Sequence, residues 1–280
     1  MFPIVDGIPV LLPDEIREHD ELEHVTDPPG SRRRQAEFYD RAVAFDFEVS
    51  RPRGAPRLYE SLLLEKFRRG TRAFRNEIRG SNTLVVCGGS GMDAEFLVQS
   101  GALVVTSDAS VGASRRAVMR AQRHRLPIGV IAADVEHLPF ADRSFDLVYV
   151  HDGLHHLAEP DRGLREMMRV ARSMISVNEP ARAAATLLAV RFGLAKHRED
   201  SGNLVARLKL RSLEVALEQG GFRVLNSERL FMYYRHAPGP WMRFASRPIL
   251  FTVTRGLLHL ADAVFGRAGN KLTIQAKRRQ

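Results

Sequence analysis

The sequence predicts an α/β fold built on a doubly wound sheet, and three observations support this prediction. Short apolar runs rich in valine and isoleucine alternate with longer amphipathic stretches of helical periodicity. A glycine-rich loop, residues 87–91, stands between one such run and a helical pattern, and acids follow the next two runs at Asp108 and Asp134. Strands that alternate with helices form parallel sheets, and the carboxyl ends of those strands meet at one edge, where ligands bind.

The loop Cys87-Gly88-Gly89-Ser90-Gly91 follows the expected strand 83–86 and precedes a helix. Glycine suits such a turn because the backbone must reach positive φ and let a ligand approach, while the free N–H groups of the helix face that ligand. Alone, this pattern is a weak signal for a phosphate or nucleoside site. Asp108 strengthens it, since 108 − 91 = 17, close to the spacing of about 20 at which a carboxylate binds ribose hydroxyls.

The remaining elements are expected in the same alternating order. Strands are predicted at 102–107, 128–132, 146–150, 174–177, 222–233 and 271–277, and helices at 58–78, 111–125, 161–170 and 211–219.

Several motifs in this order resemble one family. They are the glycine loop, Asp108, the run Ala-Asp-Val-Glu-His-Leu-Pro-Phe at 133–140, Ser-Phe-Asp-Leu-Val at 144–148 and Leu-His-His-Leu at 154–157. Together they resemble the class I S-adenosylmethionine-dependent methyltransferases, in the group that includes ubiquinone and sterol methyltransferases. The resemblance covers about residues 80–178. It implies a Rossmann-like sheet of seven strands with the last strand antiparallel, a helical insertion before that strand, and S-adenosyl-L-methionine as cofactor.

The resemblance also implies a cofactor site in which Asp108 holds the ribose and Asp134 accepts from the adenine amino group. Tyr39, in the segment Phe38-Tyr39-Asp40, would lie over the cofactor, or it would only pack on the core. The full set of expected cofactor-binding residues is Tyr39, Cys87, Gly88, Gly89, Ser90, Gly91, Asp108, Ala109, Asp134, Val135 and His151.

The loop departs from the family pattern of acid-x-Gly-x-Gly-x-Gly. The acid falls on Val85 and the first glycine on Cys87. In the family that acid helps to orient the methionyl amino group, so its loss puts cofactor affinity in doubt. Asp93 or backbone carbonyls are the candidate substitutes.

Three histidines follow the fourth strand and are the candidate catalytic residues. His151, His155 and His156 stand where cofactor and acceptor would meet, and a histidine there could take a proton from a hydroxyl acceptor. With Asp152 they could also ligate a metal. A third interpretation is that the histidines only pack and form hydrogen bonds, as the Leu-His-His-Leu segment does in similar proteins. No metal is expected. Glu179, after the fifth strand, is expected to face the acceptor.

Composition limits the remaining choices. The chain has 280 residues, of which 44% are hydrophobic, and a single cysteine, which excludes an internal disulfide and a cysteine-rich zinc site. No leader pattern opens the chain, so a cytoplasmic location is expected. The net charge of +9 would suit RNA, and residues 111–125 are rich in arginine, but such runs usually form a solvated face and nucleic acid is not the expected partner.

The predicted division is an N-terminal hairpin and linker, residues 1–34, followed by a methyltransferase domain, residues 35–280. The hairpin resembles the last part of a zinc-ribbon module without its cysteines. Residues 181–210 and 235–270 are expected to be insertions on the substrate side. Within the second insertion, one helical face is apolar, formed by Leu250, Val253, Leu257, Leu260, Ala261 and Val264.

That face would cover an apolar acceptor, rest on a membrane surface through residues 240–265, or pack on its own domain or on the second copy of a homodimer. Arg255, His259 and Asp262 make residues 248–265 too polar for a membrane span. The expected function is methyl transfer to a small, apolar or lipid-like acceptor through an O-, N- or C-nucleophile. A non-catalytic binding protein of the same fold and an RNA methyltransferase are the alternatives.

Overall fold

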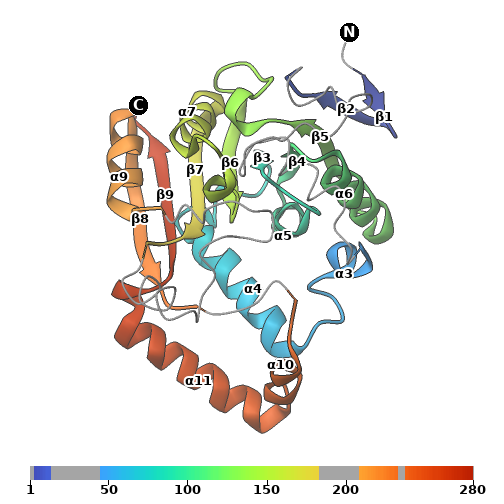
Figure 1. The fold of residues 1–280 in the computed structure, drawn as a ribbon. Coiled ribbons are helices and arrows are strands. Elements are labelled where there is room, and N and C mark those ends of the chain that lie inside the picture. The colour runs from blue at the N-terminus through green and yellow to red at the C-terminus, as the bar shows by residue number, and fades with distance from the viewer. Residues whose placement is uncertain (1–2, 14–44, 183–207, 233–236, 280) are drawn as a thin grey trace, which may run out of the picture.

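The computed structural model describes residues 3–13, 45–182, 208–232 and 237–279. Within these residues a single sheet runs through the molecule, with helices on both of its faces (Figure 1). Its strands are β1 (Ile4–Val5), β2 (Ile8–Leu11), β3 (Asn82–Val86), β4 (Leu103–Asp108), β5 (Ile128–Ala133), β6 (Phe145–His151), β7 (Ala171–Pro180), β8 (Phe222–Leu230) and β9 (Lys271–Arg278).

The strand order is β1-β2-β5-β4-β3-β6-β7-β9-β8. Strands β5, β4, β3, β6 and β7 are parallel, whereas β9 runs antiparallel to both of its neighbours. The predicted doubly wound sheet with an antiparallel last strand is therefore confirmed. The parallel strands all point their carboxyl ends to one edge, and the loops at that edge carry the candidate site.

The N-terminal hairpin adds two strands to the seven that were predicted. Asp6 and Gly7 both adopt positive φ, 51° and 79°, as a tight turn between β1 and β2 requires. Strand β2 then pairs in parallel with β5, with Val10 opposite Ala132. The hairpin is thus part of the sheet, and its descent from a zinc-ribbon module stays a prediction.

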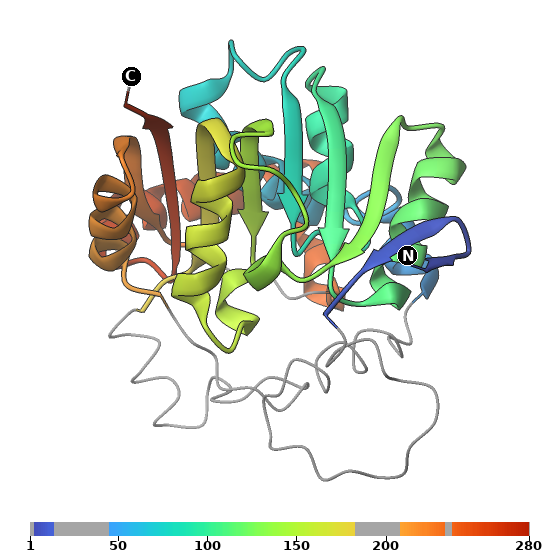
Figure 2. The ribbon, with the colours of Figure 1, turned by 90° about the horizontal axis from the view of Figure 1, so that it is seen from above.

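Helices cover both faces of the sheet, which Figure 1 and Figure 2 show from two directions. One apolar cluster joins α4 (Arg57–Gly70) and α5 (Met92–Gln99) to the sheet, and another joins α7 (Pro160–Val170) and α9 (Leu210–Gln219) to the opposite face. The helices are α3 (Phe45–Ser50), α4 (Arg57–Gly70), α5 (Met92–Gln99), α6 (Val111–His124), α7 (Pro160–Val170), α9 (Leu210–Gln219), α10 (Pro240–Ala245) and α11 (Pro248–Phe265), with short 3₁₀ turns η1 (Arg72–Phe74), η2 (Val135–His137), η3 (Leu154–His156) and η4 (Gly266–Ala268).

The predicted helix 58–78 is too long, because α4 ends at Gly70. An added Cβ there would lie 2.3 Å from the side-chain oxygen of Asn178, so only glycine lets the helix end pass so close to β7. Thr71 then leaves helical geometry, with φ of −116° and ψ of 2°, and its hydroxyl donates to the carbonyl of Phe67. The chain continues as the separate turn η1.

The arginine-rich helix α6 begins at the predicted residue and ends one residue before the predicted end, at His124. Its expected solvated face is wrong at two positions, because Arg116 and Arg120 are buried. Arg120 donates through Nε to the carbonyl of Ser90 at 2.7 Å and through Nη1 to Glu95 at 2.8 Å. It also donates to the carbonyls of Glu48 and Arg51. The fully buried guanidinium of Arg120 therefore holds the glycine loop in place through the carbonyl of Ser90.

The expected insertion 235–270 forms α10, α11 and η4, which lie outside α4 (Figure 1). The predicted apolar face is split. Leu250 and Ala261 are half-buried, whereas Val253, Leu257, Leu260 and Val264 are exposed. Most of this face points away from the domain, and its expected role as a cover over the acceptor stays a prediction. Tyr39 and residues 183–207 of the other expected insertion lie outside the described residues.

Candidate functional site at the carboxyl edge of the sheet

The glycine loop after β3 has the backbone geometry that its sequence predicts. Cys87, Gly89 and Gly91 all adopt positive φ, and Gly91 caps the N-terminus of α5. At Gly88 an added Cβ would lie 1.9 Å from Thr106 Oγ1, so a side chain would force β3 and β4 apart. At Gly89 an added Cβ would meet nothing within 4 Å. The loop is thus tightly held on one side and open above Gly89, which allows a ligand to approach its backbone.

Asp108 joins this loop to the start of α6. Its Oδ2 accepts from the backbone N–H of Gly89, and its Oδ1 accepts from that of Ser110, each at 2.9 Å. Burial raises the pKa of Asp108, although these two hydrogen bonds oppose the rise. A carboxylate offers about four lone-pair sites, so each oxygen can still accept from a diol. Ala109 follows directly, half-buried at the same edge.

Asp134 directly follows β5 and caps the N-terminus of η2. It is buried, and it accepts from the backbone N–H of Glu136 at 2.9 Å and contacts His137 Nδ1 at 3.0 Å. These contacts fix the carboxylate in the turn, and its contact with adenine stays a prediction. The neighbouring Val135 packs its side chain into the core, so only its backbone is available to a ligand.

A charged network that the sequence did not predict lies at the end of β6. His151 contacts Asp93 through Nδ1 at 2.8 Å and Asp152 through Nε2 at 3.3 Å. Asp152 also pairs with Lys66 of α4 at 2.7 Å and with Lys271 of β9 at 3.0 Å. The one available signal was Lys66 itself, a cation within the apolar stripe of α4, whereas nothing in the sequence links it to Lys271.

This network shifts the pKa of two of its members. Burial would lower the pKa of His151, but Asp93 and Asp152 outweigh burial and raise it above its ordinary value. Burial would raise the pKa of Asp152, but Lys271, Lys66 and His151 hold it well below its ordinary value. The imidazole therefore holds a proton more firmly than a free histidine does, so less of it is in the neutral form that can accept a proton from an acceptor. The assignment of His151 as the catalytic base stays a prediction.

Of the other two histidines, His155 bonds a buried glutamate and His156 packs against His155. Glu179 accepts from the backbone N–H groups of Gly153 and Leu154 through Oε1, and it bonds His155 Nδ1 through Oε2 at 2.7 Å. Glu179 is fully buried, so its expected position facing the acceptor is wrong, and it instead holds the turn η3. The ring of His156 lies 4.0 Å from that of His155. This packing favours a structural role for the pair.

The candidate metal ligands Asp152, His155 and Glu179 lie within 4.8 Å of one another. Their lone pairs already serve other partners. Asp152 is paired with two lysines, and Glu179 holds two backbone N–H groups and an imidazole. Two positive charges beside Asp152 would repel a cation. We therefore interpret the cluster as a charge network.

Val85, at the position of the family acid, is buried in the apolar cluster of α4 and α5. Asp93, the candidate substitute, lies in the first turn of α5 and is bonded to His151. The loop thus keeps the shape of the family pattern while one of its charges is absent.

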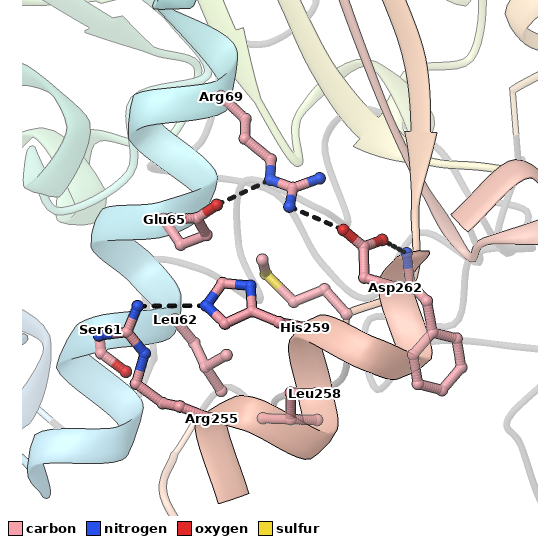
Figure 3. A pocket seen from close by; sticks show the side chains of 10 residues that line it. Ser61, Leu62, Glu65, Arg69, Arg255, Leu258, His259 and Asp262 are labelled. Carbon is pink, nitrogen blue, oxygen red and sulfur yellow. Dashed lines mark hydrogen bonds and ion pairs between the residues drawn. The ribbon is translucent and has the colours of Figure 1, made fainter. Parts of the chain in front are cut away.

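Two hollows in the described part of the chain lie away from this edge. The first, about 30 Å³, lies between α4 and α11, where Arg69 bonds Glu65 at 2.9 Å and Asp262 at 2.7 Å (Figure 3). Its volume has room for about one water molecule. The second, about 370 Å³, lies at the opposite edge of the sheet, beside the ends of α4 and α5, and is lined by Phe67, Arg75 and Phe96 among others. Neither is lined by residues of the glycine loop, where the cofactor is expected.

Residues 84–174 match the family described as methyltransferase domains. Over 106 residues the chain is 39% identical to the demethylmenaquinone methyltransferase of Corynebacterium urealyticum. These aligned residues make up 38% of this chain and 44% of that protein. The chain thus matches less than half the length of such relatives.

Two solved structures share the fold at low identity. The magnesium protoporphyrin IX methyltransferase ChlM of Synechocystis, with bound SAH, has a TM-score of 0.55 at 14% identity, over 84% of this chain and 93% of that one. The [4+2]-cyclase SpnF has a TM-score of 0.53 at 18% identity, over 76% and 80%. Residues 84–174 thus resemble methyltransferase domains in sequence, as expected, and the chain shares the fold of these two solved structures.

Proposed function

We propose that the protein is an enzyme that transfers a methyl group from S-adenosyl-L-methionine to a small, apolar or lipid-like acceptor. The observation that carries the proposal is the open glycine loop joined to Asp108, within the segment that matches methyltransferase domains. The acceptor class rests on the relative named for demethylmenaquinone, a lipid-like quinone.

The described residues fit this cofactor. The backbone above Gly89 is open, as a nucleoside requires, and the carboxylate of Asp108 stands beside it with lone pairs to spare. Asp108 would hold the ribose and Asp134 the adenine. The cofactor supplies an electrophilic methyl group on its sulfonium. The chain's own residues have to position donor and acceptor and exclude water, which is sufficient for a displacement of this kind.

Calorimetry with S-adenosylhomocysteine tests cofactor binding. The variant Asp108→Ala should bind about 10- to 150-fold more weakly, which corresponds to about 1.5–3 kcal/mol for a hydrogen bond to a charged group. Asp161→Ala, which removes an exposed acid in the first turn of α7, is the matched control and should bind like the parent. Equal affinities of a folded Asp108→Ala variant and the parent would contradict the assignment.

Methyl transfer is tested separately, by mass spectrometry after incubation with S-adenosylmethionine and a reduced demethylmenaquinone of short tail. We expect a product heavier by one methyl group, and we expect Asp108→Ala to lower its yield. Cofactor binding without any methylated lipid product would keep the cofactor site and overturn the acceptor class.

A non-catalytic binding protein is the second candidate, and the buried Val85 at the family's acid position favours it. Failure of the parent protein to bind S-adenosylhomocysteine would support this candidate. An RNA methyltransferase is less well supported, because Arg116 and Arg120 are buried and the predicted basic face of α6 loses two of its arginines. A mobility-shift assay with RNA at low and high salt tests that alternative.

Contact of residues 240–265 with a membrane surface is part of the proposal. A homodimer through the same face is its competitor. A cytoplasmic location and the division at residues 34 and 35 stay predictions.

A further inference from the structure

Helix α11 presents a row of apolar side chains to the surface. Ile249, Val253, Leu257, Leu260 and Val264 follow one another at intervals of three or four residues, and each is more than half exposed. Such spacing places them on one side of the helix. Exposed apolar side chains are normal when scattered, but a contiguous row usually marks an interaction surface.

Two aromatic side chains extend this row onto α10. Trp241 and Phe244 are 44% and 57% exposed and belong to the short helix that leads into α11. Trp is characteristic of the boundary between lipid and water, because its large ring is apolar and its N–H is polar. We call the five residues of α11 with these two aromatics the apolar row.

The charge around the apolar row is positive. Exposed arginines stand at 243, 247 and 267, and Arg247 lies over the ring of Phe244 at 5.0 Å. Between residues 237 and 279 the sequence contains one acid, Asp262. That carboxylate faces the domain, where it pairs with Arg69 and accepts from the N–H of Phe231. The apolar row therefore has a cationic border, which is complementary to anionic lipid headgroups.

Both ends of α11 are fixed to the same domain. Near the start, Ser246 accepts from the backbone N–H of Leu58 in α4. At the end, Arg229 of β8 donates to the carbonyl of Gly269. The 21-residue stretch Pro248–Ala268 is, in the described part of the chain, the one helix long and apolar enough to cross a membrane. The expectation that residues 248–265 are too polar for a span was therefore wrong by length and composition. With both ends held on one domain the helix would have to leave the fold to cross a membrane, and lying along a surface requires no such change.

A second copy of the chain fits the apolar row less well than lipid does. A two-fold contact through this row would bring the arginines at 243, 247 and 267 of one copy close to those of the other. Asp262 points inward and cannot offset them. An anionic lipid surface buries the same side chains and neutralises the same arginines.

We propose that α10 and α11 dock the protein on an anionic lipid surface through the apolar row and its arginines. The docked helix ends close to the candidate site, because η4 leads directly into Lys271, and Lys271 pairs with Asp152. If the acceptor is lipid-like, as the proposed function holds, it would reach the site from the surface on which the protein rests. Docking itself needs neither cofactor nor acceptor.

The test is co-sedimentation of the full chain with vesicles of phosphatidylcholine alone or mixed with phosphatidylglycerol. We expect binding to the anionic vesicles to be about tenfold stronger or more, and to weaken as salt is raised. The double variant Leu257→Ser/Leu260→Ser should lower binding about tenfold or more, since it removes two apolar anchors. Arg243→Gln/Arg247→Gln should lower binding to anionic vesicles and leave the weak binding to neutral ones unchanged.

Matched controls come from parts of the surface away from α10 and α11. Leu103 in β4 is 61% exposed, as is Leu257, so Leu103→Ser should bind vesicles like the parent. Arg115→Gln/Arg123→Gln, on the outer side of α6, should also do so. Equal binding of the Leu257→Ser/Leu260→Ser variant and the parent, or no binding of the parent to anionic vesicles, would overturn the proposal.

Sedimentation velocity without vesicles tests whether a second copy of the chain binds the apolar row instead of lipid. A parent dimer that dissociates in the Leu257→Ser/Leu260→Ser variant would assign the apolar row to a second copy and overturn lipid docking. Calorimetry with S-adenosylhomocysteine is independent of both experiments. A failure of docking is therefore distinguishable from a failure of the proposed function.

Discussion

Helices α6 and α11 both carry arginines and apolar side chains at helical spacing, yet they face the fold in opposite ways. Helix α6 turns Arg116 and Arg120 inward, whereas α11 turns Leu257 and Leu260 outward. The cause in each case is the partner that the fold supplies. Beneath α6 lie Glu95 and three backbone carbonyls that accept from a guanidinium, and beneath α11 lies Arg69, which binds Asp262.

The comparison shows that amphipathic periodicity defines two sides of a helix without showing which one is buried. A charged side can face inward when its hydrogen bonds are satisfied there, because paired buried charges avoid most of the cost of desolvation. An apolar side can then remain outside and become available to a partner. The predictions below test the two halves of this comparison, from the largest expected effect to the smallest.

The buried arginine of α6 should give the largest effect. Arg120→Met removes four hydrogen bonds from a closed site and leaves Glu95 buried, although Arg53 still pairs with it. We expect the free energy of unfolding to fall by about 3 kcal/mol, the lower end of the range for breaking a buried ion pair. Urea unfolding measures it, and the exposed Arg115→Met is the control, expected within about 0.5 kcal/mol of the parent. A similar small loss in both variants would mean that burial of Arg120 contributes nothing specific.

The network at Asp152 should give a pH-dependent effect. Asp152→Asn leaves Lys66 and Lys271 without their shared carboxylate and should cost about 2 kcal/mol at pH 7. The pKa of Asp152 is lowered in the folded state, so its stabilisation is present above the ordinary value of 3.8 and is lost as the pH falls through the lower, folded value.

Urea unfolding of the parent and the variant from pH 7 to pH 2 checks this sign. The two stabilities should converge in acid. A constant difference across that range would rule out the charge of Asp152 as the origin of the effect.

The inward anchor of α11 should give a moderate effect. Asp262→Asn removes the ion pair with Arg69 and weakens the hydrogen bond from Phe231, and about 1.5 kcal/mol of stability should be lost. Asp46→Asn, at a 91% exposed side chain that pairs with Arg123, is the control and should change stability little. Thermal unfolding compares them. An unchanged midpoint for Asp262→Asn would show that this contact does not hold the helix.

The outer side of α11 should give the smallest effect on stability. Leu257→Ser removes an exposed side chain and should change the free energy of unfolding by less than about 0.5 kcal/mol. Leu164→Ala in α7, at a buried side chain, should cost about 2–5 kcal/mol by comparison. A large loss for Leu257→Ser would mean that its side chain supports the isolated fold, and the case for a docking surface would weaken.

The sequence by itself determined the order of elements, the glycine loop and the acids that follow β4 and β5. These features are local. Strand runs, a turn that needs positive φ at Gly89 and Gly91, and residues directly after a strand are all fixed by neighbours along the chain. The family motifs added the antiparallel last strand, which periodicity could not supply.

Only the tertiary structure decided which charges are buried and which apolar side chains are not. Lys66 and Lys271 are separated by more than two hundred residues, and they meet at Asp152 because α4 and β9 both reach the end of β6. Glu179 was expected at the acceptor and is instead enclosed by the turn η3. The outward face of α11 depends in the same way on Arg69 and Asp262. A residue's burial depends on what the fold places opposite it, and the order of residues along one chain segment does not contain that information.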